Sequence, residues 1–364
     1  MTMTADFQDL DDKKAQKRAA ARAQMLQRIG QADRILDLVA LGWITPLLKI
    51  FAGESVKTQL QDVWRMLGVP MVAIGIFLFA WAQLAPQVKT SLGAVPGPVE
   101  VWEQTQNLWS DHIREREKEA AFYDRQEKRN QTWVEKGKPE RVKYREYTGA
   151  PTYIDQIFTS LQTVFLGFVI ATALAVPLGI ICGLSPIINS AVNPLIQIFK
   201  PVSPLAWLPI VTMVVSAVYV SQDPWFEKSF LISAITVTLC SLWPTLINTA
   251  YGVASIDKDL MNVGRVLKLG FFTKIRKLVL PSALPLIFTG LRLSLGVGWM
   301  VLIAAEMLAQ NPGLGKFVWD EFQNGSSNSL AKIMVAVVTI GIIGFLLDRI
   351  VLAIQAMTTY SATR

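Results

Sequence analysis

Apolar stretches without charged residues alternate with polar stretches along this chain. The stretches at 69–85 and about 157–184 carry no charge, and four more lie at about 201–220, 229–249, 285–308 and from 330 onward. A helix needs roughly 20 mostly apolar residues to cross a bilayer. The pattern therefore predicts an all-α integral membrane protein with about six transmembrane helices.

The polar stretches divide the chain into four parts. Residues 1–66 form a polar head, 67–86 the first transmembrane helix, 87–152 a polar insertion and 153–364 a transmembrane core. Seven basic residues and one acid lie between Lys13 and Arg34, so we expect the head to be cytoplasmic and to lie on anionic lipid. The apolar segment 35–51 is interrupted by Asp37, Pro46 and Lys49, which favours an interfacial helix over a span.

The insertion at 87–152 opens with GAVPGPVEVWEQ, which indicates a turn-rich exit from the first helix. The following residues are highly charged, with balanced signs, and predict a helix near 113–131. Such a segment is too polar to pack in lipid. It is either a docking surface for a soluble partner or a passive solvated hairpin.

Composition supports the membrane prediction. Hydrophobic residues make up 52% of the chain and charged residues 17%, below the roughly 25% usual in soluble domains. The net charge of +7 could suggest nucleic acid, but the basic residues cluster beside apolar stretches, as the positive-inside rule expects. Cys182 and Cys240 lie in apolar stretches and His112 is the only histidine, which excludes a disulfide framework and a metal cluster.

The loop at about 250–284 carries the strongest functional signal. It holds six basic residues, which places it and the N-terminus in the cytoplasm and the insertion outside. Asp257 can cap a helix whose first turn contains Asp259, and Leu260, Val263 and Leu267 would share one face. Pro281 and Pro285 would end one helix and launch the next. The pattern favours a short helix that presses against a soluble partner, although a loop that only sets topology would also be basic.

The segment 257–308 resembles the coupling loop and the following helix of ABC importer permeases. The family pattern has Glu-Ala-Ala, three residues, Gly, about nine residues, Ile, two residues and Leu-Pro. Here Asn262, Val263 and Gly264 stand at the Glu-Ala-Ala positions and Lys268 at the Gly. This variant, with 193–210 and 304–322, is similar to the nitrate branch of the nitrate/sulfonate/bicarbonate permeases. The resemblance covers about Tyr153 to the C-terminus.

The resemblance implies a type I ABC importer permease fold in a bacterial inner membrane. Two copies would form the pore, an extracytoplasmic solute-binding protein would deliver substrate, and cytoplasmic ABC ATPases would bind ATP and Mg²⁺, so this chain needs no cofactor. The implied substrate is nitrate or nitrite, with bicarbonate, cyanate and taurine or other sulfonates as alternatives. The implied ATPase contacts are Asp259, Leu260, Val263, Gly264, Arg265 and Leu267.

Four residues in the spans are candidates for a translocation pathway. Arg292 could attract an anion or extend to the inner interface, because an ionisable group within a span is costly and often functional. Glu306 is expected to pair with a polar neighbour. Ser203 and Trp207, beside prolines, could line the pore or pack in the core.

Other function classes find less support in the sequence. GLGK at 313–316 lacks the spacing and the Ser/Thr of a phosphate loop, and a catalytic triad would have to use His112. A gradient-driven secondary transporter would be expected to show inverted repeats and more ionisable groups at mid-membrane. A membrane scaffold whose insertion is the working part stays a third possibility.

Overall fold

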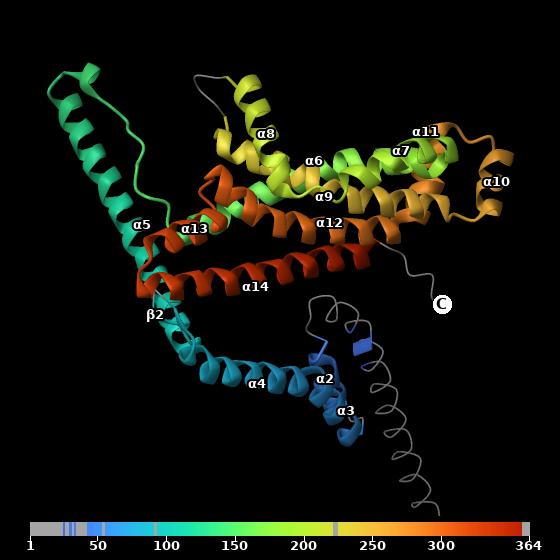
Figure 1. Cartoon of the computed structure of the whole chain (residues 1–364), viewed down its shortest axis with the longest axis horizontal. Coiled ribbons are helices and arrows are strands. Elements are labelled where there is room, and N and C mark those ends of the chain that lie inside the picture. Colours follow the sequence, from blue (N-terminus) through green and yellow to red (C-terminus); the bar gives the residue numbers. More distant parts are fainter. Residues whose placement is uncertain are drawn as a thin grey trace, which may run out of the picture. The chain divides into compact units, whose positions relative to one another are not determined.

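The computed structural model of the chain describes residues 42–52, 55–90, 93–220 and 225–358, and also 25, 29, 30 and 33. Within these residues the protein is almost entirely helical (Figure 1). The predictions for the basic head at 13–34 and for most of the first half of 35–51 fall outside the described residues.

Among the described residues, five helical segments are long and apolar enough to cross a membrane, and a bent helix pair could form a sixth span. The five segments are Val56–Gln87, Tyr153–Leu184, Lys228–Ala254, Phe271–Ala309 and Asn328–Thr358. The prediction of an all-α membrane protein with about six spans is therefore confirmed.

The chain divides into two compact units, 1–81 with 349–364, and 82–348. In the first unit, α2 (Ile44–Phe51) packs against α3 (Val56–Val63). A π-helical turn, Trp64–Gly68, joins α3 to α4 (Val69–Leu84), which begins in this unit and contains no buried residue. An apolar helix with exposed side chains is what a lipid-facing span requires.

The second unit begins with a 3₁₀ turn, Ala85–Gln87, and two short antiparallel strands, β1 (Lys89–Thr90) and β2 (Gly93–Ala94). The helix α5 (Pro98–Glu135) follows as one element of 38 residues, roughly 57 Å long at 1.5 Å per residue. The predicted helix near 113–131 was thus too short, because half of the supposed turn-rich exit is helical. The first residue of the helix is a proline. Proline has no backbone N–H, but an N–H at this position has no partner within the helix, and the fixed φ of proline suits a helix.

An extended segment, 142–151, returns along α5 and is held in register by α5 side chains. Alternate residues of an extended chain point the same way, and here three alternate backbone N–H groups donate to α5. The bonds are Lys143 N to Asn130 Oδ1 (3.4 Å), Arg145 N to Gln126 Oε1 (2.7 Å) and Tyr147 N to Tyr123 Oη (3.2 Å). The insertion is therefore an ordered hairpin.

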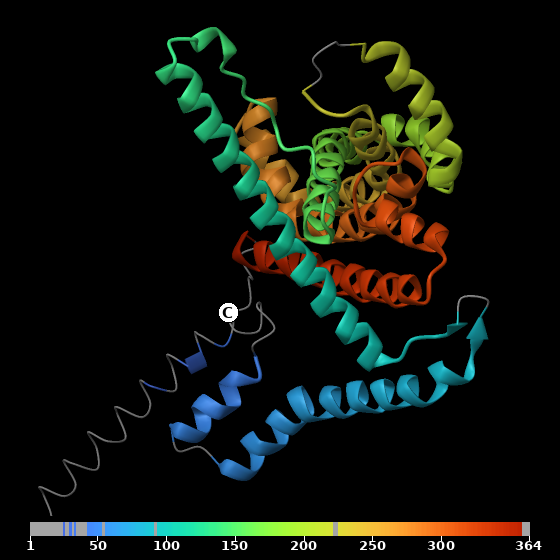
Figure 2. The ribbon, with the colours of Figure 1, turned by 90° about the vertical axis from the view of Figure 1, so that its left-hand side faces the viewer.

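The core of the second unit consists of α6 (Tyr153–Leu184), α9 (Lys228–Ala254) and α12 (Leu280–Ala309), which pack closely together (Figure 2). Small residues recur every fourth position on α6: Gly167, Ala171, Ala175, Gly179 and Gly183. A Cβ atom added at Gly179 would lie 2.8 Å from the Leu246 carbonyl oxygen. Small residues at this spacing let membrane helices approach to backbone contact.

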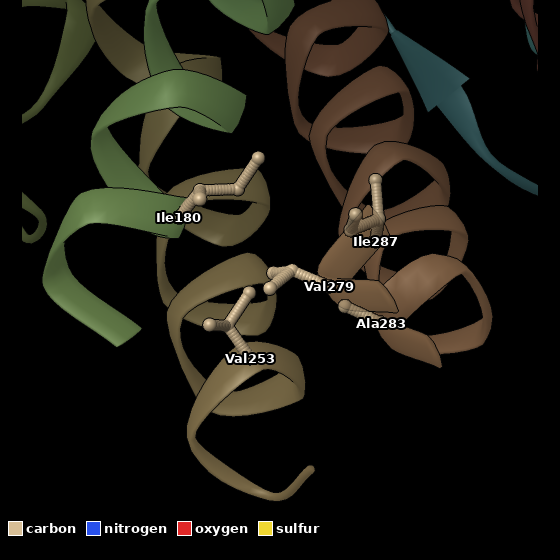
Figure 3. Packing of buried hydrophobic residues seen from close by; sticks show 5 residues of the cluster. All are labelled: Ile180, Val253, Val279, Ala283 and Ile287. Carbon is tan, nitrogen blue, oxygen red and sulfur yellow. The ribbon is translucent and has the colours of Figure 1, made fainter. Parts of the chain in front are cut away.

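The three core helices also share an apolar cluster (Figure 3). Its buried members are Ile180 of α6, Val253 of α9, Val279 at the end of the π-helical turn Ile275–Val279, and Ala283 and Ile287 at the start of α12. Because Met261 and Ile275 pack against this cluster, it connects the spans to the segment between α9 and α12.

That segment differs from the prediction at its prolines. The helix α10 (Lys258–Val266) is separate, but α11 (Phe271–Lys274), a π-helical turn (Ile275–Val279) and α12 form one continuous helical segment through Pro281 and Pro285. The prolines therefore do not end a helix. Local π adjustment and neighbouring helices can satisfy the carbonyl groups that a proline frees.

The third predicted span, 201–220, corresponds to the second helix of a bent pair. The helices α7 (Pro186–Phe199) and α8 (Pro204–Val218) are bent by 100° at the residues between them. The last two described helices are α13 (Leu314–Asn324) and α14 (Ser327–Thr358). Both α7 and α8 begin with a proline, and Ser185 and Ser203 cap their first turns. These residues define where the two helices begin.

Candidate functional site

The helix α10 begins as the sequence predicts. The Asp257 carboxylate accepts the backbone N–H of Asp259 at 2.8 Å, and Asp259 lies in the first turn, where negative charge is favourable beside the helix dipole. At the other end Lys268 adopts a left-handed conformation with φ of 45°, and the Leu269 N–H returns to the Gly264 carbonyl at 3.1 Å. Both ends of α10 are thus defined by local bonds.

The six residues predicted as contacts do not all face outward. Asp259, Val263, Arg265 and Leu267 are exposed, Leu260 is half-buried and Gly264 is buried. A Cβ at Gly264 would meet Leu278 Cδ1 at 2.7 Å. Gly264 therefore lets α10 pack closely against Leu278 of the same chain. A large side chain at position 264 would first disturb this packing.

The outward side of this segment is apolar and basic together. Val266 is 80% exposed and Phe272 is 84% exposed, beside Val263, Leu267 and Phe271. Around them lie Arg265, Lys268, Lys274, Arg276 and Lys277. We call these residues, all exposed except the half-buried Lys274, the α10 surface. Sequence reasoning missed Val266, Phe271 and Phe272, although two adjacent phenylalanines in a basic loop were a visible signal.

Glu306 is fully buried where α6, α12 and the following loop meet. Its carboxylate accepts the Ser160 hydroxyl at 2.8 Å and the Gly315 N–H at 3.0 Å, and the same hydroxyl accepts the Leu314 N–H at 2.8 Å. A Cβ at Gly313 would lie 2.2 Å from the carboxylate. The expectation that Glu306 pairs with polar neighbours agrees with this geometry, which closes the carboxylate off from a permeating solute.

Arg292 forms a two-pronged ion pair with Asp348 of α14. Arg292 Nε lies 2.6 Å from Asp348 Oδ1 and Nη2 lies 2.9 Å from Oδ2. The two side chains are 38% and 34% exposed. Fork-to-fork pairing fixes both groups and balances their charge. This arrangement differs from both expectations for Arg292, because its charge is directed to a carboxylate within the same unit.

Ser203 and Trp207 lie at the break between α7 and α8. Ser203 Oγ accepts the Leu205 N–H at 3.3 Å and so caps α8. Phe199 is within contact distance of two indole rings, with centroids 5.8 Å from Trp207 and 6.3 Å from Trp243. In the described part of the chain, neither indole N–H has a hydrogen-bond partner although both nitrogens are buried. Sequence reasoning missed Phe199 and Trp243, which only the fold brings to Trp207.

The four pathway candidates therefore separate into two kinds. Ser203 and Trp207 meet at a helix break with free hydrogen-bond donors, whereas Arg292 and Glu306 are 14 positions apart on α12, roughly 21 Å along its axis, and each has its own partners. The residues described also contain no group of three or more His, Cys, Asp or Glu side chains that could hold a metal ion.

Comparison with known proteins gives consistent matches. The profile of the family described as binding-protein-dependent transport system inner membrane component matches residues 175–358. The nitrate import permease protein NrtB of a Synechocystis species is 33% identical over 79% of this chain and 88% of that protein.

Two shorter alignments point to the same group of proteins. NrtB of Synechococcus elongatus is 36% identical over 54% of this chain and 66% of its own length. The bicarbonate transport system permease protein CmpB of the same species is 38% identical over 55% of this chain and 67% of its own length. The alignments with these two proteins thus span about two thirds of their lengths.

A solved structure also resembles the chain. It is an inward-facing conformation of the methionine ABC transporter MetNI, with a TM-score of 0.49 and 15% sequence identity. The match covers 57% of this chain and 96% of that chain.

Proposed function

Because the chain belongs to the family of binding-protein-dependent transport system inner membrane components, we propose that it is the permease subunit of an ATP-driven nitrate importer. Two copies form the translocation pathway in a bacterial inner membrane, with the N-terminus in the cytoplasm. Cytoplasmic ABC ATPases bind and hydrolyse ATP, and an extracytoplasmic solute-binding protein delivers the anion. The chain itself is a transport component and carries out no hydrolysis.

The α10 surface is the observation that carries this proposal. It joins exposed apolar side chains to basic ones, on α10 between two membrane-spanning segments and on the first residues of the segment Phe271–Ala309. A short capped helix seated on the core through Gly264 can transmit a push from a soluble partner to α12, because α11, the π-helical turn and α12 are continuous. The ATPase contact therefore consists of Asp259, Val263, Arg265, Val266 and Leu267, with Leu260 and Gly264 behind them.

The break between α7 and α8 is the better-supported candidate for the translocation pathway. Broken membrane helices border substrate sites in many transporters, and the buried indole N–H groups of Trp207 and Trp243 are neutral donors that an anion can accept from. Ser203 adds a hydroxyl at the same break. Arg292 and Glu306 act as braces, because both have partners within the chain.

The test is ATPase stimulation in the complex reconstituted in membranes with its native partners. Nitrate, bicarbonate and taurine are compared at equal ionic strength in the presence of the binding protein. We expect stimulation by nitrate. The identity with CmpB makes bicarbonate the second candidate, and stimulation by bicarbonate alone would keep the permease and overturn the substrate. Transport without any ATPase in the preparation would overturn both.

The α10 surface gives a sharper prediction. Val266→Glu places a carboxylate on a side chain that is 80% exposed, so the fold should tolerate it while the apolar contact with an ATPase is lost. We expect at least a tenfold loss of uptake with unchanged expression and thermal unfolding. The control is Val134→Glu on α5, which is 58% exposed and lies in a charged segment outside the spans and outside the α10 surface. Equal uptake by Val266→Glu and wild type would contradict the assigned contact.

A further inference from the structure

The first half of α5 exposes an apolar stripe that the transport function does not explain. Trp102 is 64% exposed and Trp109 is 57% exposed, with Val99 and Ile113 also exposed. At 3.6 residues per turn these four side chains fall on one side of the helix. We call them the Trp stripe. Two exposed tryptophans on one helix face are unfavourable in water, so we expect the stripe to contact something other than water.

The other sides of the same helix are already accounted for. Val101 and Leu108 are buried against the rest of the unit, and His112 Nδ1 lies 2.7 Å from the Thr152 hydroxyl at the start of α6. By helical spacing Glu100 points away from the Trp stripe, whereas Glu103, one turn after Val99, lies at the edge of the stripe. The stripe is thus a distinct third side that is not packed and carries a single charge, at its edge.

Charge separates this half of α5 from the other half. Only three of the 16 residues in 98–113 are charged, whereas 12 of the 22 residues in 114–135 are. The distal half also supports the ordered return segment, in which Tyr144 is 82% exposed. One continuous helix therefore changes from apolar and aromatic to strongly charged along its length.

The Trp stripe adjoins the end of a membrane-spanning helix. An open groove of about 390 Å³ is lined by Trp102 and Trp109 of α5 together with Tyr153 and Ile154 of α6. Figures 1 and 2 show α5 running across the end of the bundle where α6 begins. With 32 residues, α6 is roughly 48 Å long, longer than the hydrocarbon core of roughly 30 Å. Its first turn can therefore lie at headgroup level.

We propose that the Trp stripe lies in the headgroup layer of the bilayer, while the distal half of α5 stands in water. On α6, Phe158 and Phe165 are also exposed, and Phe158 lies one turn beyond Ile154, which lines the groove beside the stripe. Indole rings favour this layer because they combine a large apolar body with a polar N–H. The stripe holds α5 across the end of the bundle and fixes where the charged hairpin begins.

Two neighbouring polar residues allow the test without changing the tryptophans. Gln106 shares the side of the Trp stripe and lines the groove, whereas Asn107, also exposed, points away from it. Each is changed to Cys in a chain with Cys182→Ser and Cys240→Ser, labelled with a nitroxide, and reconstituted in nanodiscs with the native partners. Tyr144→Cys on the return segment is the aqueous reference.

Electron paramagnetic resonance then compares collisions with oxygen, which enriches in lipid, and with a water-soluble nickel chelate. We expect the label at 106 to favour oxygen at least threefold more than the labels at 107 and 144. Equal access of nickel to 106, 107 and 144 would overturn the proposal. Protection of 106 from both reagents would also overturn it, because a protein surface or a second copy would then cover the stripe. The result does not depend on which anion is transported.

Discussion

The helices α6, α9 and α12 form one group of apolar spans, and α14 is a fourth apolar span beside them. The three helices of the group pack against one another in a different way from that in which α14 packs against α12. The first three meet through glycine and alanine, so backbone lies against backbone. The helix α14 is attached to α12 through long side chains, with the Arg292–Asp348 pair at one level and a bond from Trp299 Nε1 to the Ile340 carbonyl (3.0 Å) at another. Close packing gives the first group one arrangement, whereas long side chains hold the backbones of α12 and α14 further apart.

The largest expected effect is a methyl group in the close-packed group. Gly179→Ala places a Cβ 2.8 Å from the Leu246 carbonyl oxygen and 2.6 Å from Thr249 Cβ, so the α6 and α9 backbones must separate. We expect a loss of about 1–3 kcal/mol of unfolding free energy, measured as a fall in thermal midpoint in detergent. Gly341→Ala on α14 is the matched control, since nothing lies within 4 Å of its added Cβ. A similar fall for both variants would abolish the distinction between the two regions.

The next effect concerns the tether of α14. Arg292→Ala leaves Asp348 without its main counter-charge within a span, and we expect a loss of about 1–2 kcal/mol, less than for a fully buried pair. Arg292→Lys should lose less, because it keeps the charge but not the two-pronged geometry. Arg292→Ala with Asp348→Ala should cost less than the sum of the two single changes. Additive losses in this double-mutant cycle would show that the pair does not couple α12 to α14.

The smallest effect comes from the α5 hairpin, which uses polar tethers outside the membrane. The hydrogen bond from the Tyr147 hydroxyl, 2.6 Å from Glu115, holds the pKa of that carboxyl below its usual range. A lowered carboxyl pKa stabilises the folded hairpin above the unfolded pKa of roughly 4.3, and this contribution is lost as the pH falls through the folded pKa. Tyr147→Phe should flatten the pH dependence of proteolysis at 142–151 in acid. An unchanged pH profile would contradict this account.

Short-range features of the fold follow from the sequence. The uncharged stretches predict the spans, and Asp257 predicts the start of α10, because both depend on residues close together in the chain. The Arg292–Asp348 pair joins residues 56 positions apart, and the buried side of Gly264 depends on Leu278 beyond the next turn. Neither contact is encoded in local periodicity. The prolines misled because a proline usually indicates a helix end in water, whereas here the helix continues through both.

The π-helical turn at Ile275–Val279 fixes the rotational register between α11 and α12. Such a turn is equivalent to one extra residue within an α-helix, and one residue corresponds to about 100° of rotation. Deleting a single residue within 275–279 would therefore restore a regular helix but rotate everything before it about the α12 axis. The α10 surface would then face a different direction with its composition intact. The extra residue therefore sets the direction in which the α10 surface faces. That direction depends on the rotation along the helix as much as on the side chains of the surface.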